Sequence, residues 1–353
     1  MTIMPPNCGT QCWLCDLPIH MDTYVGCSHG CTYCFTGGFA GKTYTGIKDL
    51  GIKPKNETNA LRAFIKGKRT KETNWCDWPI PLHWGGMSDP FQPCEAIYKQ
   101  SLECLKVFAE TNYPFVVSTK GALIATEPYI SLLAKCNCVV QLSMACEGYD
   151  KIEPGAPPFE ERLRILKKVS KVVPRTVCRI QPYLAGHREA IKANLARMKE
   201  AGAYGVIIEG MKWDRPGKGL VKVGRDYTYP YRVISNDFEY LRNEAHQVGL
   251  KIYAGENRIR EKGDSLTCCG IDGLDGFRPN TYNLNHHLHG DLTKPTEAMT
   301  LPKTAGCFRP NWQDTLNGRY IDAQSFAFAM NKFRKDKRKL VESSFALSEE
   351  GKR

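Results

Sequence analysis

The sequence predicts an α/β protein, a partial (β/α)6 barrel of the TIM type followed by a loop-rich C-terminal extension. Between residues 22 and 255, short apolar runs alternate with amphipathic segments. The apolar runs are rich in Val, Ile and Tyr, as expected for strands buried on both faces of a parallel sheet. Strand–helix repeats of this kind connect with a right-handed turn and curve into a barrel. We therefore expect the active site at the carboxyl ends of the strands.

Seven runs are predicted to be strands: 22–26, 80–86, 114–119, 138–144, 175–183, 204–210 and 250–255. The helices are predicted between them, at 59–69, 93–110, 127–136, 158–172, 189–202 and 236–249. In the fifth helix, Ile191, Leu195 and Met198 recur at helical spacing and Gly202 suits its end.

The periodicity stops after residue 255, where Gly, Asn and His become frequent. This change divides the chain into three parts. We expect a cysteine-containing N-terminal arm at 1–20, a barrel core at 21–255, and an extension with a closing helix at 256–353.

The composition is that of a globular protein: 353 residues, 42% hydrophobic and 24% charged. No apolar stretch is long enough to predict a membrane-spanning helix, and the first residues lack the pattern of a secretory signal. We therefore expect a cytoplasmic protein without a membrane partner. In a reducing compartment, the 16 cysteines do not indicate a disulfide framework.

The net charge is strongly positive, since 49 Lys and Arg minus 37 Asp and Glu gives +12. Such an excess favours polyanionic partners through the surface potential and counterion release. The positive charge therefore predicts that the binding partner is a nucleic acid, DNA above all, or a nucleotide-linked substrate. A charge that serves solubility alone is the alternative.

Cys27, Cys31 and Cys34 form a C-x3-C-x2-C group in "GCSHGCTYCF". Structural zinc and a fully ligated iron–sulfur cube each require four protein ligands. Three cysteines in one tight loop can instead hold three irons of a [4Fe–4S] cube and leave the fourth iron open. Gly26 and Gly30 allow the backbone to wrap closely around the inorganic sulfide.

Five blocks occur in order within residues 20 to 210: "YVGCSHGCTYCF", "GGMSDPFQPCE", "VVSTKG", "LSMACEGYDKIEPGAPPFEERL" and "RIQPYLAG". Together they resemble the radical S-adenosylmethionine (radical SAM) superfamily, in its spore photoproduct lyase-like or DNA repair photolyase branch. The resemblance implies that the open iron binds SAM. It also implies that an electron from a donor such as flavodoxin or ferredoxin cleaves SAM to a 5′-deoxyadenosyl radical, which abstracts a hydrogen atom from the substrate.

The resemblance also implies cofactor-binding residues. Tyr33 supplies an aromatic wall, and Gly85, Gly86 and Met87 correspond to the glycine-rich turn that meets the SAM amino group. Met87 replaces the usual acidic residue, so Asp89 is a candidate for the carboxylate. Further candidates at strand ends are Ser118, Thr119, Lys120, Ser143, Glu147 and Arg179, the last as a bidentate partner of the SAM carboxylate.

A second triplet, Cys8, Cys12 and Cys15, repeats the spacing in "CGTQCWLC". It predicts an auxiliary iron–sulfur cluster or a zinc ion, with Cys268, Cys269 or Cys307 as the fourth ligand; spacing alone does not separate the two metals. Free thiols on an arm are the alternative.

Three functions fit the sequence. The first is a radical SAM lyase or isomerase acting on a base in DNA, in repair, rearrangement or modification, such as tailoring of a hypermodified pyrimidine in viral DNA. The thiol that returns a hydrogen atom in spore photoproduct lyases is missing before Ser88, which favours an isomerase over dimer repair. The second is radical tailoring of a peptide or small metabolite, and the third is a non-enzymatic iron–sulfur or zinc protein that binds nucleic acid.

Overall fold

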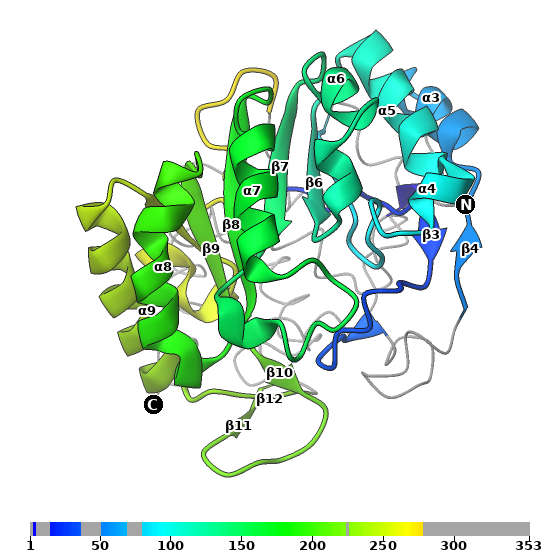
Figure 1. The fold of residues 1–353 in the computed structure, drawn as a ribbon. Coiled ribbons are helices and arrows are strands. Elements are labelled where there is room, and N and C mark those ends of the chain that lie inside the picture. Colours follow the sequence, from blue (N-terminus) through cyan, green and yellow to red (C-terminus); the bar gives the residue numbers. More distant parts are fainter. Residues whose placement is uncertain (1–2, 5–14, 37–50, 69–79, 224–225, 278–353) are drawn as a thin grey trace, which may run out of the picture.

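The predicted α/β fold is confirmed by a computed structural model, which describes residues 3–4, 15–36, 51–68, 80–223 and 226–277. Its main sheet has the strand order β1-β2-β5-β6-β7-β8-β9-β13 (Figure 1). Seven of these strands run parallel, and β1 (Ile3–Met4) pairs antiparallel with β2 at one edge. The parallel strands are β2 (His20–Met21), β5 (Leu82–Trp84), β6 (Phe115–Thr119), β7 (Cys138–Ser143), β8 (Arg175–Tyr183), β9 (Gly205–Gly210) and β13 (Lys251–Ala254).

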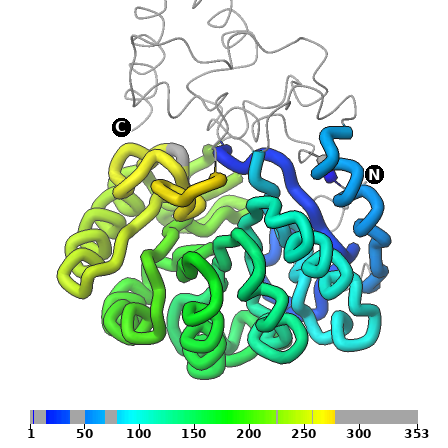
Figure 2. Tube along the Cα trace, turned by 90° about the horizontal axis from the view of Figure 1, so that it is seen from above, coloured from blue at the N-terminus to red at the C-terminus, as the bar shows by residue number. Residues whose placement is uncertain are grey.

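Helices cover the outer face of this curved sheet, as Figures 1 and 2 show. They are α3 (Thr58–Ile65), α4 (Glu95–Tyr98), α5 (Gln100–Thr111), α6 (Tyr129–Leu133), α7 (Phe159–Val169), α8 (Arg188–Glu200) and α9 (Tyr231–Gln247). Short 3-10 turns are η2 (Ala122–Ala125), η3 (Glu147–Tyr149), η4 (Ala185–His187) and η5 (Asn257–Lys262). The helix predicted at 93–110 is divided in two, because Lys99 adopts a left-handed φ of 52°. Within the described ranges, no helix is both long and apolar enough to cross a membrane.

The strand predicted at 22–26 differs from the structure. The barrel strand is β2, and the chain then leaves the main sheet, because the Asp22 carboxylate accepts hydrogen bonds from the backbone N–H groups of Met87 and Ser88. The next residues form β3 (Tyr24–Val25), which pairs antiparallel with β4 (Lys53–Pro54) in a separate small sheet. Leu17 is fully buried, so the described part of the predicted arm packs with the barrel.

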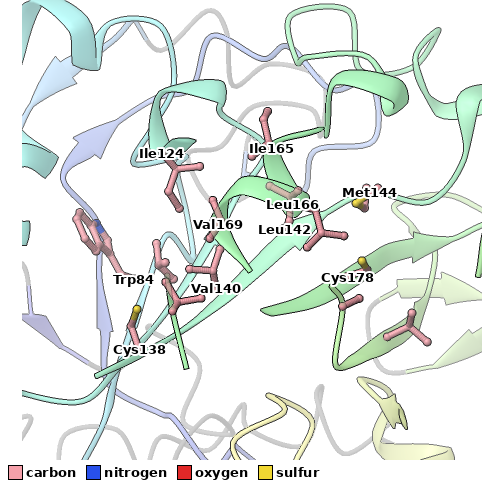
Figure 3. Packing of buried hydrophobic residues seen from close by; sticks show 14 of the residues in the cluster. Trp84, Ile124, Cys138, Val140, Leu142, Met144, Ile165, Leu166, Val169 and Cys178 are labelled. Atoms are coloured by element: carbon pink, nitrogen blue, oxygen red, sulfur yellow. The ribbon is translucent and has the colours of Figure 1, made fainter. Parts of the chain in front are cut away.

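The main core lies between the sheet and the helices. Cys138, Val140 and Leu142 alternate along β7 and belong to the same buried cluster as residues of α7, as Figure 3 shows. The α7 residues in the close-up are Ile165, Leu166 and Val169. Their spacing places them on one helical face. Burial of each such side chain contributes about 1.5–3 kcal/mol.

The opposite side chains of the same strands fill the barrel interior in layers. Near the amino ends of the strands lies an apolar layer of Val116, Val139, Val177, Ile207 and Tyr253. One step towards the carboxyl ends, the inward residues are polar: His20, His83, Ser118, Gln141 and Arg179. The barrel therefore has a closed, apolar amino end and a polar interior beneath its carboxyl edge.

Two further segments frame the barrel. Residues 264–277 cross the amino ends of the strands, where Arg175 donates hydrogen bonds to the carbonyls of Gly270 and Asp272. A three-stranded flap of β10 (Lys212–Trp213), β11 (Val221–Val223) and β12 (Asp226–Thr228) follows the carboxyl end of β9 (Figure 1). The sequence did not predict this flap, since its strands are only two or three residues long.

Candidate active site

The loop that carries Cys27, Cys31 and Cys34 is anchored at the carboxyl edge of the barrel. Its backbone pairs with the segment after β7: the Thr32 N–H donates to the Ile152 carbonyl at 2.9 Å, and the Gly155 N–H donates to the His29 carbonyl at 2.8 Å. The three cysteines are free, half-buried thiols. The loop therefore lies at the carboxyl end of the barrel, as expected, although β3, which precedes it, lies outside the main sheet.

Gln92 and Asp89 connect the same loop to the segment after β5. The fully buried Gln92 side chain accepts a hydrogen bond from the Ser28 N–H at 2.8 Å and donates one to the Gly26 carbonyl at 3.2 Å. His29 Nε2 lies 3.1 Å from Asp89 Oδ2, with both side chains buried. The loop is thus held on two sides before any metal binds.

The donor set of the loop, three free thiols, is of the kind that iron–sulfur clusters use. Burial, and next the Asp89 charge, raise the pKa of the Cys27 thiol to about 12. Burial also raises the pKa of Cys31, an effect that the Lys120 ammonium opposes. Metal binding must therefore displace these protons, as cysteine ligation generally does. Among the described residues, no three Cys, His, Asp or Glu side chains are placed to hold a single metal ion.

Glu153 forms the centre of a buried charged group beside the cysteine loop. Its carboxylate accepts a hydrogen bond from the Tyr33 hydroxyl and pairs with the Arg162 guanidinium. Lys120 Nζ lies 3.8 Å from Glu153 Oε1 and 5.7 Å from the centroid of the Tyr33 ring. The predicted aromatic wall is thus fixed through Glu153. Because Lys120 is next to Cys31, it places positive charge where anionic ligands would gather.

The predicted glycine turn after β5 is tightly enclosed. Gly85 has a φ of +89°, and a Cβ atom there would lie 2.4 Å from the Ser118 carbonyl oxygen. A Cβ atom on Gly86 would lie 2.6 Å from His20 Nδ1. The Met87 N–H is occupied by Asp22 at 2.9 Å. Only glycine fits here, and the turn presents backbone rather than side chains at the carboxyl edge.

Asp89 has a different environment from the one the sequence suggested. Its carboxylate accepts hydrogen bonds from the Thr119 hydroxyl at 2.6 Å and from the backbone N–H groups of Lys120 and Phe91 at 2.6 and 2.9 Å. Burial opposes ionisation, but His29 and these donors lower the pKa of Asp89 to about 2. The carboxylate is therefore engaged by the protein, and it fastens the ends of β5 and β6 to the cysteine loop.

Ser118 and Arg179 belong to the polar layer beneath this edge. Arg179 Nη1 donates to Gln141 Oε1 at 2.7 Å and to Ser118 Oγ at 3.1 Å, and His83 Nε2 lies 2.9 Å from Ser118 Oγ. Burial, and next the charge of Arg179, lower the pKa of His20 to about 4. At neutral pH the layer is therefore one cation surrounded by neutral hydrogen-bonding groups.

Two predicted site residues remain, Ser143 at the end of β7 and Glu147 in the loop that follows, and the structure places them apart. Ser143 is buried and shares its side of β7 with Gln141, so it faces the interior. Glu147 accepts hydrogen bonds from Asn194 at 3.0 Å and Arg197 at 2.9 Å on α8. The structure therefore brings Ser143 to the site and ties Glu147 to the outer helix.

The second cysteine group falls partly outside the described residues, which exclude Cys8, Cys12 and Cys307. Of the rest, Cys15 contacts Cys269, and Cys268 Sγ lies 3.6 Å from Cys269 Sγ. The hydrogen bond from Cys269 and the charge of Arg260 lower the pKa of Cys268, although burial opposes this shift. These thiols lie at the amino end of the barrel, opposite the Cys27 loop.

Sequence reasoning missed Asp22, His29, Gln92, Glu153 and Arg162. Most of their contacts join residues 64 to 126 positions apart, which no local pattern reveals. Arg162 did give a signal, because it stands on the apolar stripe of α7 between Phe159 and Ile165. A charge at such a position indicates a buried partner.

Comparison with known proteins supports the fold and leaves the activity open. No protein-family model matches the chain. Uncharacterized protein ORF301 of Acidianus two-tailed virus is 26% identical over 198 residues, 52% of this chain and 62% of that protein. Uncharacterized protein Rv2578c of Mycobacterium tuberculosis is 25% identical over 203 residues, covering 53% of this chain and 57% of that protein. The match thus spans about three fifths of these relatives' length.

Among solved structures, the fold is similar to that of spore photoproduct lyase. A mutant of that enzyme with dinucleoside spore photoproduct superimposes with a TM-score of 0.51 and 14% identity, covering 67% of this chain and 77% of that chain. A second mutant of the same enzyme gives a TM-score of 0.50 at 14% identity. The observed α/β fold, with its seven-strand parallel sheet, agrees with the partial barrel that the sequence predicted.

Proposed function

We propose that the protein is a radical SAM enzyme acting on a base of a nucleic acid or on a nucleotide-linked substrate. One observation carries the proposal: three free thiols in a pre-anchored loop stand at the carboxyl edge of a partial barrel, joined through Asp89 to an enclosed glycine turn. Cys27, Cys31 and Cys34 would hold a [4Fe–4S] cluster. When bound, this cluster supplies the electron that cleaves SAM to a 5′-deoxyadenosyl radical.

The chain's own residues would bind SAM and the substrate and orient them. Gly85 and Gly86 offer a side-chain-free surface against which SAM can approach the backbone. Lys120 attracts anionic groups to the edge, and the polar layer around Arg179 offers several hydrogen-bonding groups to a polar substrate. The apolar layer below it closes the barrel and limits access of water to a reactive intermediate.

Two features support a nucleic-acid substrate. The chain carries a net charge of +12, and the flap beside the site exposes Arg215, Lys218 and Lys222. In the flap region the rings of Trp213 and Tyr229 make a T-shaped contact with centroids 5.2 Å apart. Cationic and aromatic groups together are typical of surfaces that hold single-stranded nucleic acid. Spore photoproduct lyase, whose fold is similar, was solved with a dinucleoside spore photoproduct.

We further propose isomerisation rather than dimer repair. Gly86 and Met87 precede Ser88, and neither carries a thiol that could return hydrogen to a substrate radical. In an isomerase, the hydrogen atom taken by the deoxyadenosyl group returns to the rearranged substrate, so no further donor is needed. SAM is then regenerated.

The first experiment tests cofactor chemistry. The anaerobically reconstituted, reduced protein is incubated with SAM, and 5′-deoxyadenosine is quantified by chromatography. We expect Cys31→Ala to abolish 5′-deoxyadenosine and to keep the far-UV circular dichroism of the parent, because the loop lies at the strand ends rather than in the core. Undiminished 5′-deoxyadenosine from Cys31→Ala would contradict the assignment of the cluster ligands.

The second experiment identifies the substrate. Reduced protein with SAM is incubated with DNAs that carry ordinary or hypermodified pyrimidines, and the nucleosides are analysed by mass spectrometry. A substrate deuterated at the reacting carbon should pass deuterium into SAM under isomerisation. Unchanged nucleosides from every DNA, together with SAM cleavage in the presence of a peptide, would reject the nucleic-acid substrate.

A further inference from the structure

Glu209 is a carboxylate that faces the barrel interior near the carboxyl end of β9. It follows Ile207 of the interior apolar layer by two positions, and side chains two apart on a strand share one face. The chain at the end of the neighbouring β13 leaves room for it. A Cβ atom on Gly255 would lie 2.8 Å from Glu209 Cβ and 3.2 Å from Glu209 Oε2. The glycine therefore allows the carboxylate to occupy this place.

The two oxygens of this carboxylate have different surroundings. Oε1 accepts a hydrogen bond from Lys212 Nζ of the flap strand β10 at 2.6 Å. Among the described side chains, none donates a hydrogen bond to Oε2. The Glu209 side chain is 15% exposed and that of Lys212 is 46% exposed, so solvent reaches this pair. Glu209 therefore keeps one acceptor available for a ligand.

Gln181 on β8 offers the opposite kind of group. Its Oε1 accepts a hydrogen bond from Arg179, whose guanidinium lies in the polar layer, so Gln181 faces the interior as well. This bond occupies the amide oxygen, and no acceptor among the described residues binds the Nε2 group. The ladder pairs of β8 and β9 on either side of Gln181 place it beside Glu209, on strands about 4.8 Å apart.

Across β8, β9 and β10 the three groups form the order donor, acceptor, donor: the Gln181 amide, the Glu209 carboxylate and the Lys212 ammonium. The complementary edge has the order acceptor, donor, acceptor. A pyrimidine-2,4-dione presents this order, because its imide N–H lies between two carbonyl oxygens. A cytosine-type edge would instead bring an unprotonated ring nitrogen against the carboxylate, and the site would then leave polar groups unpaired.

Resting on the proposed function, we propose that Gln181, Glu209 and Lys212 read the Watson–Crick edge of the substrate base, and that this base is a pyrimidine-2,4-dione. Glu209 Oε2 accepts a hydrogen bond from the imide N–H, whereas Gln181 and Lys212 donate to the two carbonyl oxygens. Enzymes that act on a base commonly recognise it by hydrogen bonds of this kind once it has left the stack.

The test compares oligo(dT) with an oligo(dT) of the same length that is methylated at N3, which removes the imide N–H and keeps every phosphate. Affinities are measured by fluorescence anisotropy on the anaerobically reconstituted protein with SAM and without reductant. We expect the parent protein to bind oligo(dT) at least about tenfold more tightly, as for loss of a hydrogen bond to an ionised group. Glu209→Ala should bind both equally, and Glu209→Gln, which keeps an acceptor oxygen without the charge, should show an intermediate preference.

Glu103→Ala is the matched control. Glu103 on α5 also binds a lysine three residues later, Lys106 at 2.7 Å, but both side chains are about half exposed on the outer surface, so this variant should keep the parent's preference. Far-UV circular dichroism checks the fold of each variant. If Glu209→Ala does not fold, Gly255→Ala replaces it, because its methyl group would displace the Glu209 carboxylate and should also remove the preference.

Three outcomes would overturn this assignment and leave the proposed function standing: equal affinity of the parent for the two oligonucleotides, the same preference in Glu209→Ala as in the parent, or tighter binding of oligo(dC) than of oligo(dT). Failure of the parent to bind any of these oligonucleotides would reject the nucleic-acid substrate together with this base-reading role. The 5′-deoxyadenosine assay reports the cofactor chemistry independently of both.

Discussion

Glu153 shows how single residues hold the candidate site together. Its carboxylate lies between the Tyr33 hydroxyl of the cysteine loop and the Arg162 guanidinium of α7. The side chains of Glu153 and Arg162 are only 3% and 2% exposed. Arg162 also donates to the Ser143 carbonyl at 2.9 Å. One buried ion pair therefore joins the cysteine loop, the end of β7 and α7.

We expect Glu153→Ala to destabilise the protein by about 3–5 kcal/mol, because it leaves the Arg162 charge buried without its partner. The measurement is the free energy of unfolding from urea denaturation. Replacing both residues, as in E153L/R162M, should recover much of the loss, since the Arg162 charge is then no longer buried without its partner.

Glu160→Ala is the control for this prediction. Glu160 pairs with Arg197 on the surface, where the side chains are 54% and 39% exposed, and removal of such a pair costs about 0–1 kcal/mol. Equal losses for Glu153→Ala and Glu160→Ala would show that the buried pair has no special part in stability.

The residues proposed to touch a cofactor stand in clearer sequence patterns than the residues that hold their loops in place. Cys27, Cys31, Cys34 and Gly85 stand in short local patterns whose chemistry is readable. Glu153 meets Tyr33 across 120 positions of sequence, and its role depends on packing that only the fold provides. Asp89 was predicted to bind the cofactor, and its hydrogen-bond partners in the structure could not be foreseen from its neighbours in sequence.

At the scale of elements, long buried strands were predicted well and short ones were not. The predicted strand at 175–183 coincides with β8, because its nine residues carry a clear β-branched and aromatic signal. The barrel strand β2 has only two residues, too few for periodicity, and the more apolar-looking 22–26 was predicted instead. Asp22 ends β2 in the structure, because its carboxylate accepts hydrogen bonds from the backbone N–H groups of Met87 and Ser88.

The turn after β5 and the strand β2 should be coupled through Gly86 and His20. A methyl group on Gly86 would lie 2.6 Å from His20 Nδ1, so we expect Gly86→Ala to lower stability by about 1–3 kcal/mol through overpacking. His20→Ala makes room for that methyl group. The double variant should therefore lose less stability than the two single variants together, with a coupling of about 1–2 kcal/mol.

Urea denaturation of the four proteins in the cycle gives this coupling. Gly186→Ala is the control, because nothing lies within 4 Å of a Cβ atom at that position, and it should change stability little. Strictly additive effects of Gly86→Ala and His20→Ala on the free energy of unfolding would show that β2 and the turn after β5 are not sterically coupled.

At the scale of the whole molecule, the two ends of the barrel differ in chemistry. The carboxyl edge combines three thiols, an enclosed glycine turn and buried charges, whereas the amino end is closed by an apolar layer and the segment at 264–277. Gln141 joins the polar layer to the segment at the amino end, because it binds both Arg179 and the Cys269 carbonyl. In the part of the chain that the structure describes, the segment at 264–277 thus covers the amino end, whereas the flap stands at the carboxyl side.

This asymmetry predicts where a polyanion binds. Lys218 and Lys222 are exposed on the flap, next to the proposed active site. Each phosphate that a lysine no longer neutralises should reduce the slope of log K against log salt by about 0.7 for a single strand. We expect K218A/K222A to weaken binding of single-stranded DNA and to reduce that slope by about 1–1.5. Fluorescence anisotropy at several salt concentrations measures both quantities.

K167A/K168A on α7 is the matched control, because these exposed lysines lie on the helical face away from the flap. If both pairs changed the slope equally, the positive charge would act as a diffuse field and not through a docking site at the flap.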